Sequence, residues 1–294
     1  MTRAPHPASP LVRLHDPSPL TMLMRRLDAA ADGVAAPDSV STGFPSVDRL
    51  LGGGVRRGDL VVLGGDVGSG KSALALAIAL RAAAEGRSVT FFSAEMAPER
   101  ALERALAMEG RAAIDDIRRG TLDDAGRAGV GAAALRLRDG APTLDRFGPG
   151  GIAVLADSLR RALDTGLAVV DPLQGLPTGA APREEELASA VLRLKELALE
   201  LGIAMVVTSH LPLLQRSRPD ARPTLDDFGA LGAVREHADV VLSLYREEMY
   251  NPGHGAEGAT ELHVLKNRGG ATGYVDLYFY KRWMRFEDMV EPNK

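Results

Sequence analysis

Short hydrophobic runs alternate with longer helical patterns over most of this chain. The short runs are rich in Val and Leu and carry almost no charge, which is typical of strands buried on both faces of a sheet. In the longer segments, apolar residues recur at the spacing of a helix. The predicted strands are 59–63, 88–93, Leu167–Asp171, 203–209 and Val240–Tyr245, and the predicted helices are one from Ser72 onward, 98–108, a stretch that continues to Arg138, 152–163 and Arg183–Leu201.

Three further strand-like segments, 259–266, 274–279 and 283–287, follow one another near the C-terminal end without a helix between them. Strands joined by short turns pair antiparallel, whereas strands separated by helices pair in parallel. The pattern therefore predicts an α/β fold, with a mostly parallel twisted sheet flanked by helices and antiparallel strands at its C-terminal edge.

The first 40 residues differ from the rest. Prolines crowd the beginning of the chain, which predicts a flexible arm, and residues 20–27 have the pattern of a short amphipathic helix. Asp32-Gly33 and Pro37 separate this helix from the rest of the chain. We therefore expect an arm with a short linker-like helix over residues 1–40 and one large domain over residues 41–290.

A glycine-rich stretch lies between a predicted strand and a predicted helix; it reads Gly65-Asp66-Val67-Gly68-Ser69-Gly70-Lys71-Ser72. Glycines without a Cβ let successive backbone N–H groups curl around a phosphate, and the next helix points the positive end of its dipole at the same anion. Lys71 adds a charge for the β- and γ-phosphate oxygens, and Ser72 offers a hydroxyl suited to Mg²⁺. The alternative is a glycine-rich turn without function, but the flanking strand and helix are what a phosphate-binding loop requires. The chain is expected to bind a nucleoside triphosphate.

Composition narrows the classes of protein further. With 45% hydrophobic residues the chain can bury a substantial core, and the absence of cysteine excludes disulfides and thiolate metal sites and agrees with a reducing cytoplasm. No apolar run approaches the roughly 20 residues of a membrane span. We therefore expect a cytoplasmic protein that has no membrane partner. The formal charge of −4 argues against a protein that coats nucleic acid through bulk positive charge, but it leaves a narrow basic channel open.

Two carboxylates come after predicted strands near the place where the phosphate loop should lie. Asp171 ends an apolar strand, where an acidic side chain can hold Mg²⁺ through its water shell, although it can also cap a turn before Pro172. Glu95 comes just after strand 88–93 and can polarise an attacking water. It can equally favour the first turn of the helix that begins at Pro98. Spacing alone does not choose between the two roles of Glu95.

Three cationic or polar residues come after other strands. His210 lies just beyond Thr208-Ser209 and can sense the γ-phosphate, although a lone histidine is more often structural. Lys266 and Arg268 leave a strand just before two glycines. Cations at such a turn can reach the γ-phosphate bound by a neighbouring subunit, but a solvated basic turn has the same pattern.

Taken together, these segments resemble the C-terminal motor domain of the bacterial replicative helicases of the DnaB family, which are RecA-like P-loop NTPases of superfamily 4. The likeness runs in order from about residue 41 to residue 286. Besides the phosphate loop it rests on 41–50 (STGFPSVDRL), 92–96 (FSAEM), 117–124 (IRRGTLDD), 170–174 (VDPLQ), 238–241 (ADVV), 245–252 (YREEMYNP) and 266–270 (KNRGG).

The resemblance implies a RecA-like ATPase fold over residues 41–290, a ring of usually six subunits, hydrolysis of Mg²⁺-ATP between neighbours and movement along single-stranded DNA. It assigns the roles residue by residue. Lys71 and Ser72 hold phosphate and metal, Glu95 resembles the catalytic base, Asp171 the second metal-site acid, Gln174 the amide near the nucleotide, and Lys266 and Arg268 the trans-acting cations. Helix 20–27 is similar in placement to the linker helix by which each subunit grips the next.

The chain departs from the family at several places. His210 stands where many bacterial members have Gln, whereas the phage helicase-primases of the same superfamily resemble this chain in having His at that place. Gly229 and Ala230 replace the Arg-Glu pair of the family's DNA-gripping loop, so the grip on DNA should be weak, absent or shifted to the preceding loop, where Arg216, Arg218 and Arg222 are otherwise ordinary surface charges. The chain also shows no counterpart of the family's helical N-terminal domain, so we do not expect it to be the main replicative helicase of its cell.

Three functions remain open from the sequence. The first is an ATP-dependent DNA helicase or translocase of the DnaB type. The second is a RecA-like regulatory or recombination-accessory ATPase without unwinding activity, which the glycine at position 229 favours. The third is a degenerate subunit that binds nucleotide as structural glue, and the intact Glu95, Asp171 and Arg268 argue against it.

Overall fold

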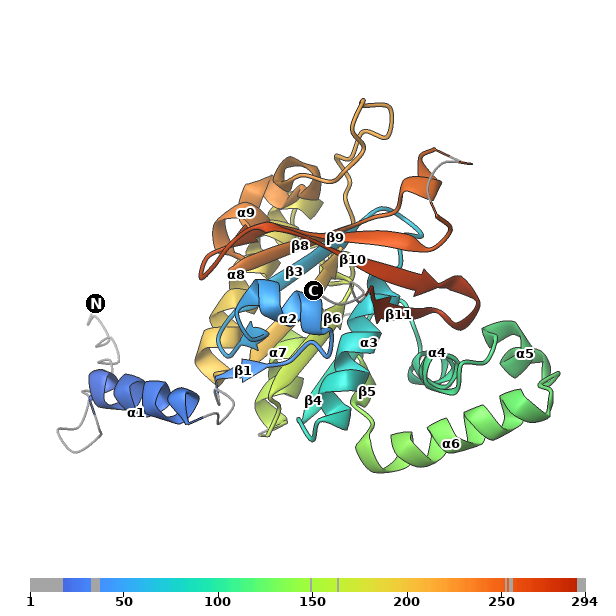
Figure 1. Cartoon of the computed structure of the whole chain (residues 1–294). Helices are drawn as coiled ribbons and strands as arrows, with labels where there is room; N and C mark the ends of the chain where they lie inside the picture. Colours follow the sequence, from blue (N-terminus) through green and yellow to red (C-terminus); the bar gives the residue numbers. More distant parts are fainter. Residues whose placement is uncertain are drawn as a thin grey trace. The chain divides into compact units, whose positions relative to one another are not determined.

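The computed structural model describes residues 18–32, 38–148, 150–162, 164–251, 253 and 256–289 (Figure 1). The chain divides into two units, Met1–Asp38 and Ser39–Lys294. In the first, helix α1 (Pro19–Ala31) is longer than the predicted helix 20–27. Its apolar side chains are exposed; they are Leu20, Met22, Leu23, Met24 and Leu27. Residues 1–17 of the expected arm lie outside the described residues.

The second unit is built on a nine-stranded sheet with the strand order β11-β10-β9-β8-β3-β7-β6-β4-β5. From β8 to β5 neighbouring strands are parallel, and from β8 to β11 they are antiparallel. The strands are β3 (Leu60–Gly65), β4 (Val89–Ser93), β5 (Thr143–Arg146), β6 (Leu167–Asp171), β7 (Ala204–Ser209), β8 (Val240–Tyr245), β9 (Ala259–Asn267), β10 (Gly273–Tyr280) and β11 (Arg285–Asp288). The predicted α/β fold with an antiparallel C-terminal edge is confirmed.

Helices cover both faces of this sheet (Figure 1). Alternate residues of β3 point to opposite sides: Val61 and Leu63 join a core with α2, α3 and α4, while Leu60 and Val62 join a second core with α7, α8 and α9. The helices are α2 (Pro45–Leu51), α3 (Lys71–Ala84), α4 (Pro98–Gly110), α5 (Ile114–Arg119), α6 (Asp124–Gly140), α7 (Gly151–Arg161), α8 (Arg183–Leu201) and α9 (Ala233–His237). Burial of β3 on both faces explains why its sequence is a continuous apolar run.

Some elements differ from the prediction. Strand β5 lies at the sheet edge and most of its side chains are exposed, so it lacks the apolar run by which the buried strands are recognised. The short pair β1 (Ser39–Val40) and β2 (Val55–Arg56) was also not predicted. Strand β11 begins at Arg285 and not at residue 283, because Lys281–Trp283 form a 3₁₀ turn and Met284 has a left-handed φ of 55°.

The parallel strands create two functionally different edges. Strands β3, β4, β6 and β7 end side by side, with Ser93 opposite Asp171 and Gly64 opposite Ser209. We call this the phosphate edge because the phosphate loop leaves β3 there. At the opposite edge, Val240 at the start of β8 pairs with Asn267 at the end of β9. No helix in the described part of the chain is long and apolar enough to cross a membrane.

Candidate functional site

The phosphate loop connects β3 to α3, and its backbone requires glycine. Gly68 and Gly70 have φ angles of 82° and 103°, which side chains other than hydrogen rarely allow. A Cβ on Gly65 would lie 2.4 Å from the hydroxyl of Ser69, and one on Gly70 would lie 2.8 Å from the ring of Phe286. Strand β11 therefore packs directly under the loop, and the loop takes the path that the sequence motif predicts.

Lys71 begins α3 at the phosphate edge and is largely buried. Its ammonium group donates a hydrogen bond to the carbonyl of Asp66 at 3.1 Å. Burial lowers the pKa of Lys71, while the charges of Asp171, Asp66 and Glu95 oppose that shift. A desolvated ammonium group beside an N-terminal helix turn is a strong attractor for phosphate oxygens.

Ser72 and Asp171 meet at the same edge. The hydroxyl of Ser72 donates to Oδ1 of Asp171 at 2.9 Å, and the buried Thr208 hydroxyl donates to the same oxygen. In the described part of the chain, no three His, Cys, Asp or Glu side chains form a cluster that could hold a metal by themselves. One hydroxyl and one carboxylate nevertheless fit Mg²⁺, because this ion takes its remaining oxygen ligands from water and substrate phosphates.

Glu95 lies in the bend after β4 and outside helix α4, whose first turn contains Glu99 instead. The Glu95 side chain is exposed, and its carboxylate is close enough to act electrostatically on both Lys71 and His210. Glu95 is therefore within electrostatic reach of the candidate site, and Glu99 is the first-turn acid of α4. Its role as catalytic base stays a prediction.

His210 and Gln174 are held together at the end of β7. The amide of Gln174 donates to the Ser209 hydroxyl at 3.1 Å and accepts from the backbone N–H of His210 at 3.0 Å. Burial lowers the pKa of His210, and the positive charge of Lys71 lowers it further. This shift favours the neutral imidazole, which can donate one hydrogen bond to a phosphate oxygen. The direct nucleotide contact expected of Gln174 stays a prediction, since its amide is engaged with β7.

The loop after β7 contacts the phosphate loop through an ion pair. Arg216 approaches Asp66 with two nitrogens, Nε to Oδ2 at 2.7 Å and Nη2 to Oδ1 at 2.9 Å, and the hydroxyl of Tyr250 donates to Oδ2 at 3.2 Å. Burial would raise the pKa of Asp66, but the hydrogen bond from Arg216 and other contacts outweigh it and lower the pKa. Asp66 is therefore negatively charged although it belongs to a loop that should bind phosphate, and Arg216 neutralises this charge.

We predict that Arg216→Ala weakens nucleotide binding about tenfold, because an unneutralised carboxylate then faces the triphosphate. The double variant Arg216→Ala/Asp66→Asn should regain most of the affinity, since neither charge remains. Titration of a fluorescent ATP analogue at low and high salt measures both, and the loss should shrink at high salt. Equal affinities of the single variant and the unmodified protein would exclude this electrostatic role.

Arg104 on α4 is a residue that the sequence interpretation missed. With Lys71, Ser72 and Phe279 it lines a cavity of about 410 Å³ beside the phosphate loop. Its Nε atom is buried and has no hydrogen-bond partner within the described residues. Burial lowers the pKa of Arg104, and Asp171 opposes that shift. Its position on a charged, Ala-rich helix is typical of a solvent-facing side chain, so the sequence contains no signal for it.

Lys266 and Arg268 lie at the opposite edge of the sheet from the phosphate loop. The ammonium of Lys266 donates to the carbonyl of Arg235, while Arg268 pairs with Asp239 at 3.2 Å and donates to the carbonyl of Glu236. These two residues are therefore next to each other, as the sequence indicated, and they do not lie in the site of their own chain.

Gly229 and Ala230 are packed against an acidic residue, Glu184. The backbone N–H of Ala230 donates to Glu184 at 2.6 Å, and a Cβ on Gly229 would lie 2.9 Å from Pro212 and 3.2 Å from Glu184. The loop arginines are engaged within the chain, since Arg218 pairs with Asp227, Arg222 with Glu261 and Arg216 with Asp66.

A glycine-rich loop between β3 and α3, with Asp171 at the end of a nearby parallel strand hydrogen-bonded to Ser72, is the arrangement of a P-loop protein of the nucleotide-binding α/β class. The chain belongs to the family of DnaB-like helicase C-terminal domains, whose sequence model matches residues 39–288. Replicative DNA helicase DnaB of Geobacillus stearothermophilus is 29% identical over 260 residues, which are 85% of this chain and 56% of that protein. Replicative DNA helicase DnaC of Bacillus subtilis is 29% identical over 258 residues, 85% of this chain and 56% of that protein. The chain thus spans little more than half the length of these relatives.

Solved structures show the same fold. One solved ATPase domain superposes with a TM-score of 0.84 at 22% identity, over 94% of this chain and all of that one. A DnaB-like replicative helicase, studied with its interactions with primase, gives a TM-score of 0.83 at 22% identity over 94% of this chain and 68% of that one. The RecA-like fold implied by the sequence is therefore confirmed.

Proposed function

We propose that this chain is an ATP-dependent DNA motor of the DnaB type, which hydrolyses Mg²⁺-ATP at interfaces between identical subunits. In this proposal the subunits form a ring, usually of six, that moves along single-stranded DNA in the cytoplasm. Membership of the DnaB-like helicase family supports the general assignment, and the matched relatives are replicative DNA helicases.

The main support for a shared site is that the phosphate loop and Arg268 lie far apart within one chain. The phosphate loop with Lys71 follows the carboxyl end of β3. Arg268 follows Asn267, which pairs with Val240 at the start of β8, so Arg268 lies at the other end of these strands. The length of β8 between these edges is about 16 Å at roughly 3.3 Å per residue. Arg268 cannot complete the site of its own chain at that distance. Head-to-tail packing would bring it to the cradle of the next subunit, and repeated packing of this kind closes into rings.

Catalysis in the proposed site is mainly positional and electrostatic. Ser72 and Asp171 would hold Mg²⁺, which when bound would supply positive charge against the negative charge that develops on the phosphoryl group. Lys71 binds the β- and γ-phosphate oxygens, and Glu95 aligns and polarises the attacking water. Arg268 of the neighbouring subunit stabilises the charge on the transferred phosphoryl group. Arg104 offers its unpartnered Nε to a phosphate oxygen in the same chain.

The exposed apolar side chains of α1 give independent support for assembly. A helix with several exposed Leu and Met residues needs a surface on which to bury them. As a linker helix, α1 would bury this face on an adjacent subunit.

A specific observation also favours a second function, a RecA-like regulatory or recombination-accessory ATPase without unwinding activity. Glu184 lies against Gly229 and Ala230, where a phosphate-binding side chain would be needed for a firm grip on DNA. Arg218 and Arg222 are engaged in ion pairs with Asp227 and Glu261. A chain that hydrolyses ATP without binding DNA would still need all the residues at the phosphate edge, including Lys71, Ser72 and Asp171.

One experiment distinguishes these functions. The ATPase rate is measured with and without single-stranded DNA, together with displacement of a labelled strand and the mass of the assembly by light scattering. We expect an oligomer whose turnover rises with single-stranded DNA and which displaces the strand. Turnover that DNA leaves unchanged would favour the regulatory ATPase, and full turnover by a monomer would refute the shared site.

A further inference from the structure

Asp239 joins the two elements from which the trans-acting arginine projects. It is the last residue before β8, and its side chain is only 6% exposed. Its backbone carbonyl accepts the N–H of Arg268 at 2.8 Å, and its Oδ1 atom pairs with the Arg268 guanidinium at 3.2 Å. One residue thus fixes both ends of Arg268, the main chain and the charged tip.

The other carboxylate oxygen is anchored to the protein core. Oδ2 of Asp239 accepts the backbone N–H of Leu60 at 2.9 Å and the ammonium of Lys195 at 2.6 Å. Leu60 begins β3 and Lys195 belongs to α8, so the carboxylate is held by two rigid elements. The carboxylate of Asp239 is therefore oriented before Arg268 pairs with it. Little conformational entropy is then lost when the pair forms.

Lys195 also affects the net charge around Arg268. A carboxylate that paired only with Arg268 would cancel the positive charge that a phosphoryl group needs. Lys195 lies nearer to Asp239 than Arg268 does, at 2.6 Å against 3.2 Å, and its side chain is nearly buried at 13% exposure. The buried pair of Lys195 and Asp239 is neutral, so Arg268 keeps a net positive charge while it is oriented.

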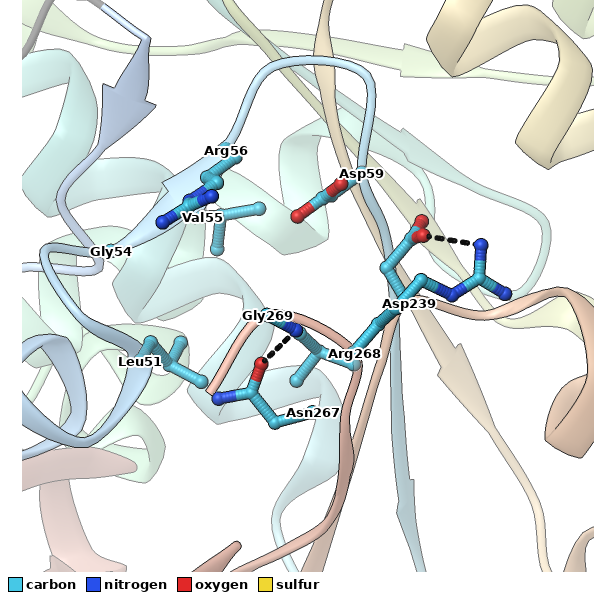
Figure 2. Close-up of a pocket in the computed structure, with 10 residues that line it drawn as sticks. Leu51, Gly54, Val55, Arg56, Asp59, Asp239, Asn267, Arg268 and Gly269 are labelled. Atoms are coloured by element: carbon cyan, nitrogen blue, oxygen red, sulfur yellow. Dashed lines mark hydrogen bonds and ion pairs between the residues drawn. The ribbon is translucent and has the colours of Figure 1, made fainter. Parts of the chain in front are cut away.

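The geometry leaves Arg268 able to bind a second anion. Its side chain is 54% exposed; Nη1 forms the ion pair with Asp239, and Nη2 donates a hydrogen bond to the carbonyl of Glu236. A guanidinium group has five N–H donors, so further donors remain for a phosphate oxygen. The cavity beside it, about 210 Å³ in volume, opens at the opposite edge of the sheet and is lined by Arg56, Asp59 and Asn267 (Figure 2).

We propose that Asp239 is a positioning residue for catalysis in the neighbouring subunit: with Lys195 it orients the guanidinium of Arg268 toward the γ-phosphate bound by the next copy of this chain. This role rests on the proposed shared site. Asp239 itself touches no substrate. It acts only through Arg268, and only in the subunit that supplies Arg268.

Mixed assemblies test this role. An Arg268→Ala subunit keeps its cradle but supplies no arginine, and a Lys71→Ala subunit supplies the arginine but has no working cradle. Each alone should be nearly inactive, and an equimolar mixture should regain turnover at the mixed interfaces. We call the Arg268→Ala subunit the cradle parent and the Lys71→Ala subunit the arginine-supplying parent. Asp239→Asn is then added to one of these parents or to the other. Its amide oxygen can stay with Lys195 and Leu60, which turns the –NH₂ group, a donor, toward the Arg268 guanidinium.

We expect Asp239→Asn to lower kcat about tenfold, with the KM for ATP unchanged, when it is in the arginine-supplying parent, and to have no effect in the cradle parent. Small misplacements of a catalytic group have losses of this order or larger. Asp157→Asn, at an exposed carboxylate on α7 that lies 3.6 Å from Arg160, is the matched control and should change neither value. Equal losses in both placements, or no loss in either, would overturn the positioning role.

The recovery of activity on mixing tests the shared site separately from the role of Asp239, which rests on it. Parents that regain no activity on mixing would refute the shared site, and the role of Asp239 with it. If Asp239→Asn lowers the melting temperature, Asp239→Glu replaces it. The longer side chain keeps the charge but moves the guanidinium, so a loss confined to the arginine-supplying parent is again expected, and a loss in both parents would again overturn the role.

Discussion

Replacing Arg268 with alanine is expected to reduce ATP turnover by about a thousandfold or more while nucleotide binding is retained. An arginine supplied to a phosphoryl-transfer site by a neighbour typically contributes a factor of roughly 10³ to 10⁵, because it stabilises charge that develops only in the transition state. Arg268 lies at the opposite edge of the sheet from its own cradle, so its loss leaves Lys71, Ser72 and Asp171 unchanged. Steady-state turnover and titration of a fluorescent ATP analogue measure the two quantities separately.

Arg282→Ala is the matched control for this experiment. The side chain of Arg282 is 74% exposed and its acidic partner, Asp116, is 3.6 Å away, so its removal should leave turnover within about twofold of the unmodified protein. Turnover of Arg268→Ala equal to that of the control would show that the arginine has no catalytic role. A parallel loss of nucleotide affinity would instead indicate that Arg268 acts on folding or on assembly.

The sequence predicted those parts of the site that are continuous in the chain or lie at strand ends. The phosphate loop is a single stretch, and Asp171 and Glu95 come after strands whose apolar runs are unmistakable. Parallel strands bring such ends to one edge, so position along the chain was enough to group them. Position along the chain did not decide the role of Lys266 and Arg268, since a solvated basic turn has the same pattern; their trans-acting role was implied by the resemblance and stays a prediction.

Contacts between distant segments could not be predicted. Arg216 and Asp66 are 150 positions apart, and nothing in either segment indicates that the loop after β7 returns to the phosphate loop. The link from Asp239 to Arg268 depends on the pairing of β8 with β9, and Arg104 has the pattern of a surface residue. The roles of these residues depend on the fold, because tertiary packing alone determines which polar groups lose their water and need a partner.

Glu95→Gln is expected to lower turnover by about a hundredfold or more without loss of ATP binding. Glutamine has nearly the same shape, but its neutral amide is a poor acceptor for the proton of an attacking water. Removing a negative charge that acts on Lys71 should leave phosphate binding intact or slightly stronger. Single-turnover hydrolysis with saturating enzyme isolates the chemical step from product release.

Glu99→Gln provides the comparison for this last experiment, since Glu99 is the acidic residue in the first turn of α4. It should have little effect, because a single exposed charge at a helix N-terminus contributes only about 0.3 to 1 kcal/mol to stability and nothing to the chemical step. The two variants thus separate a catalytic carboxylate from a helix-stabilising one a few residues away. If Glu95→Gln hydrolyses ATP as fast as Glu99→Gln, the attacking water must be activated by another group, and His210, whose pKa is lowered by burial, becomes the next residue to replace.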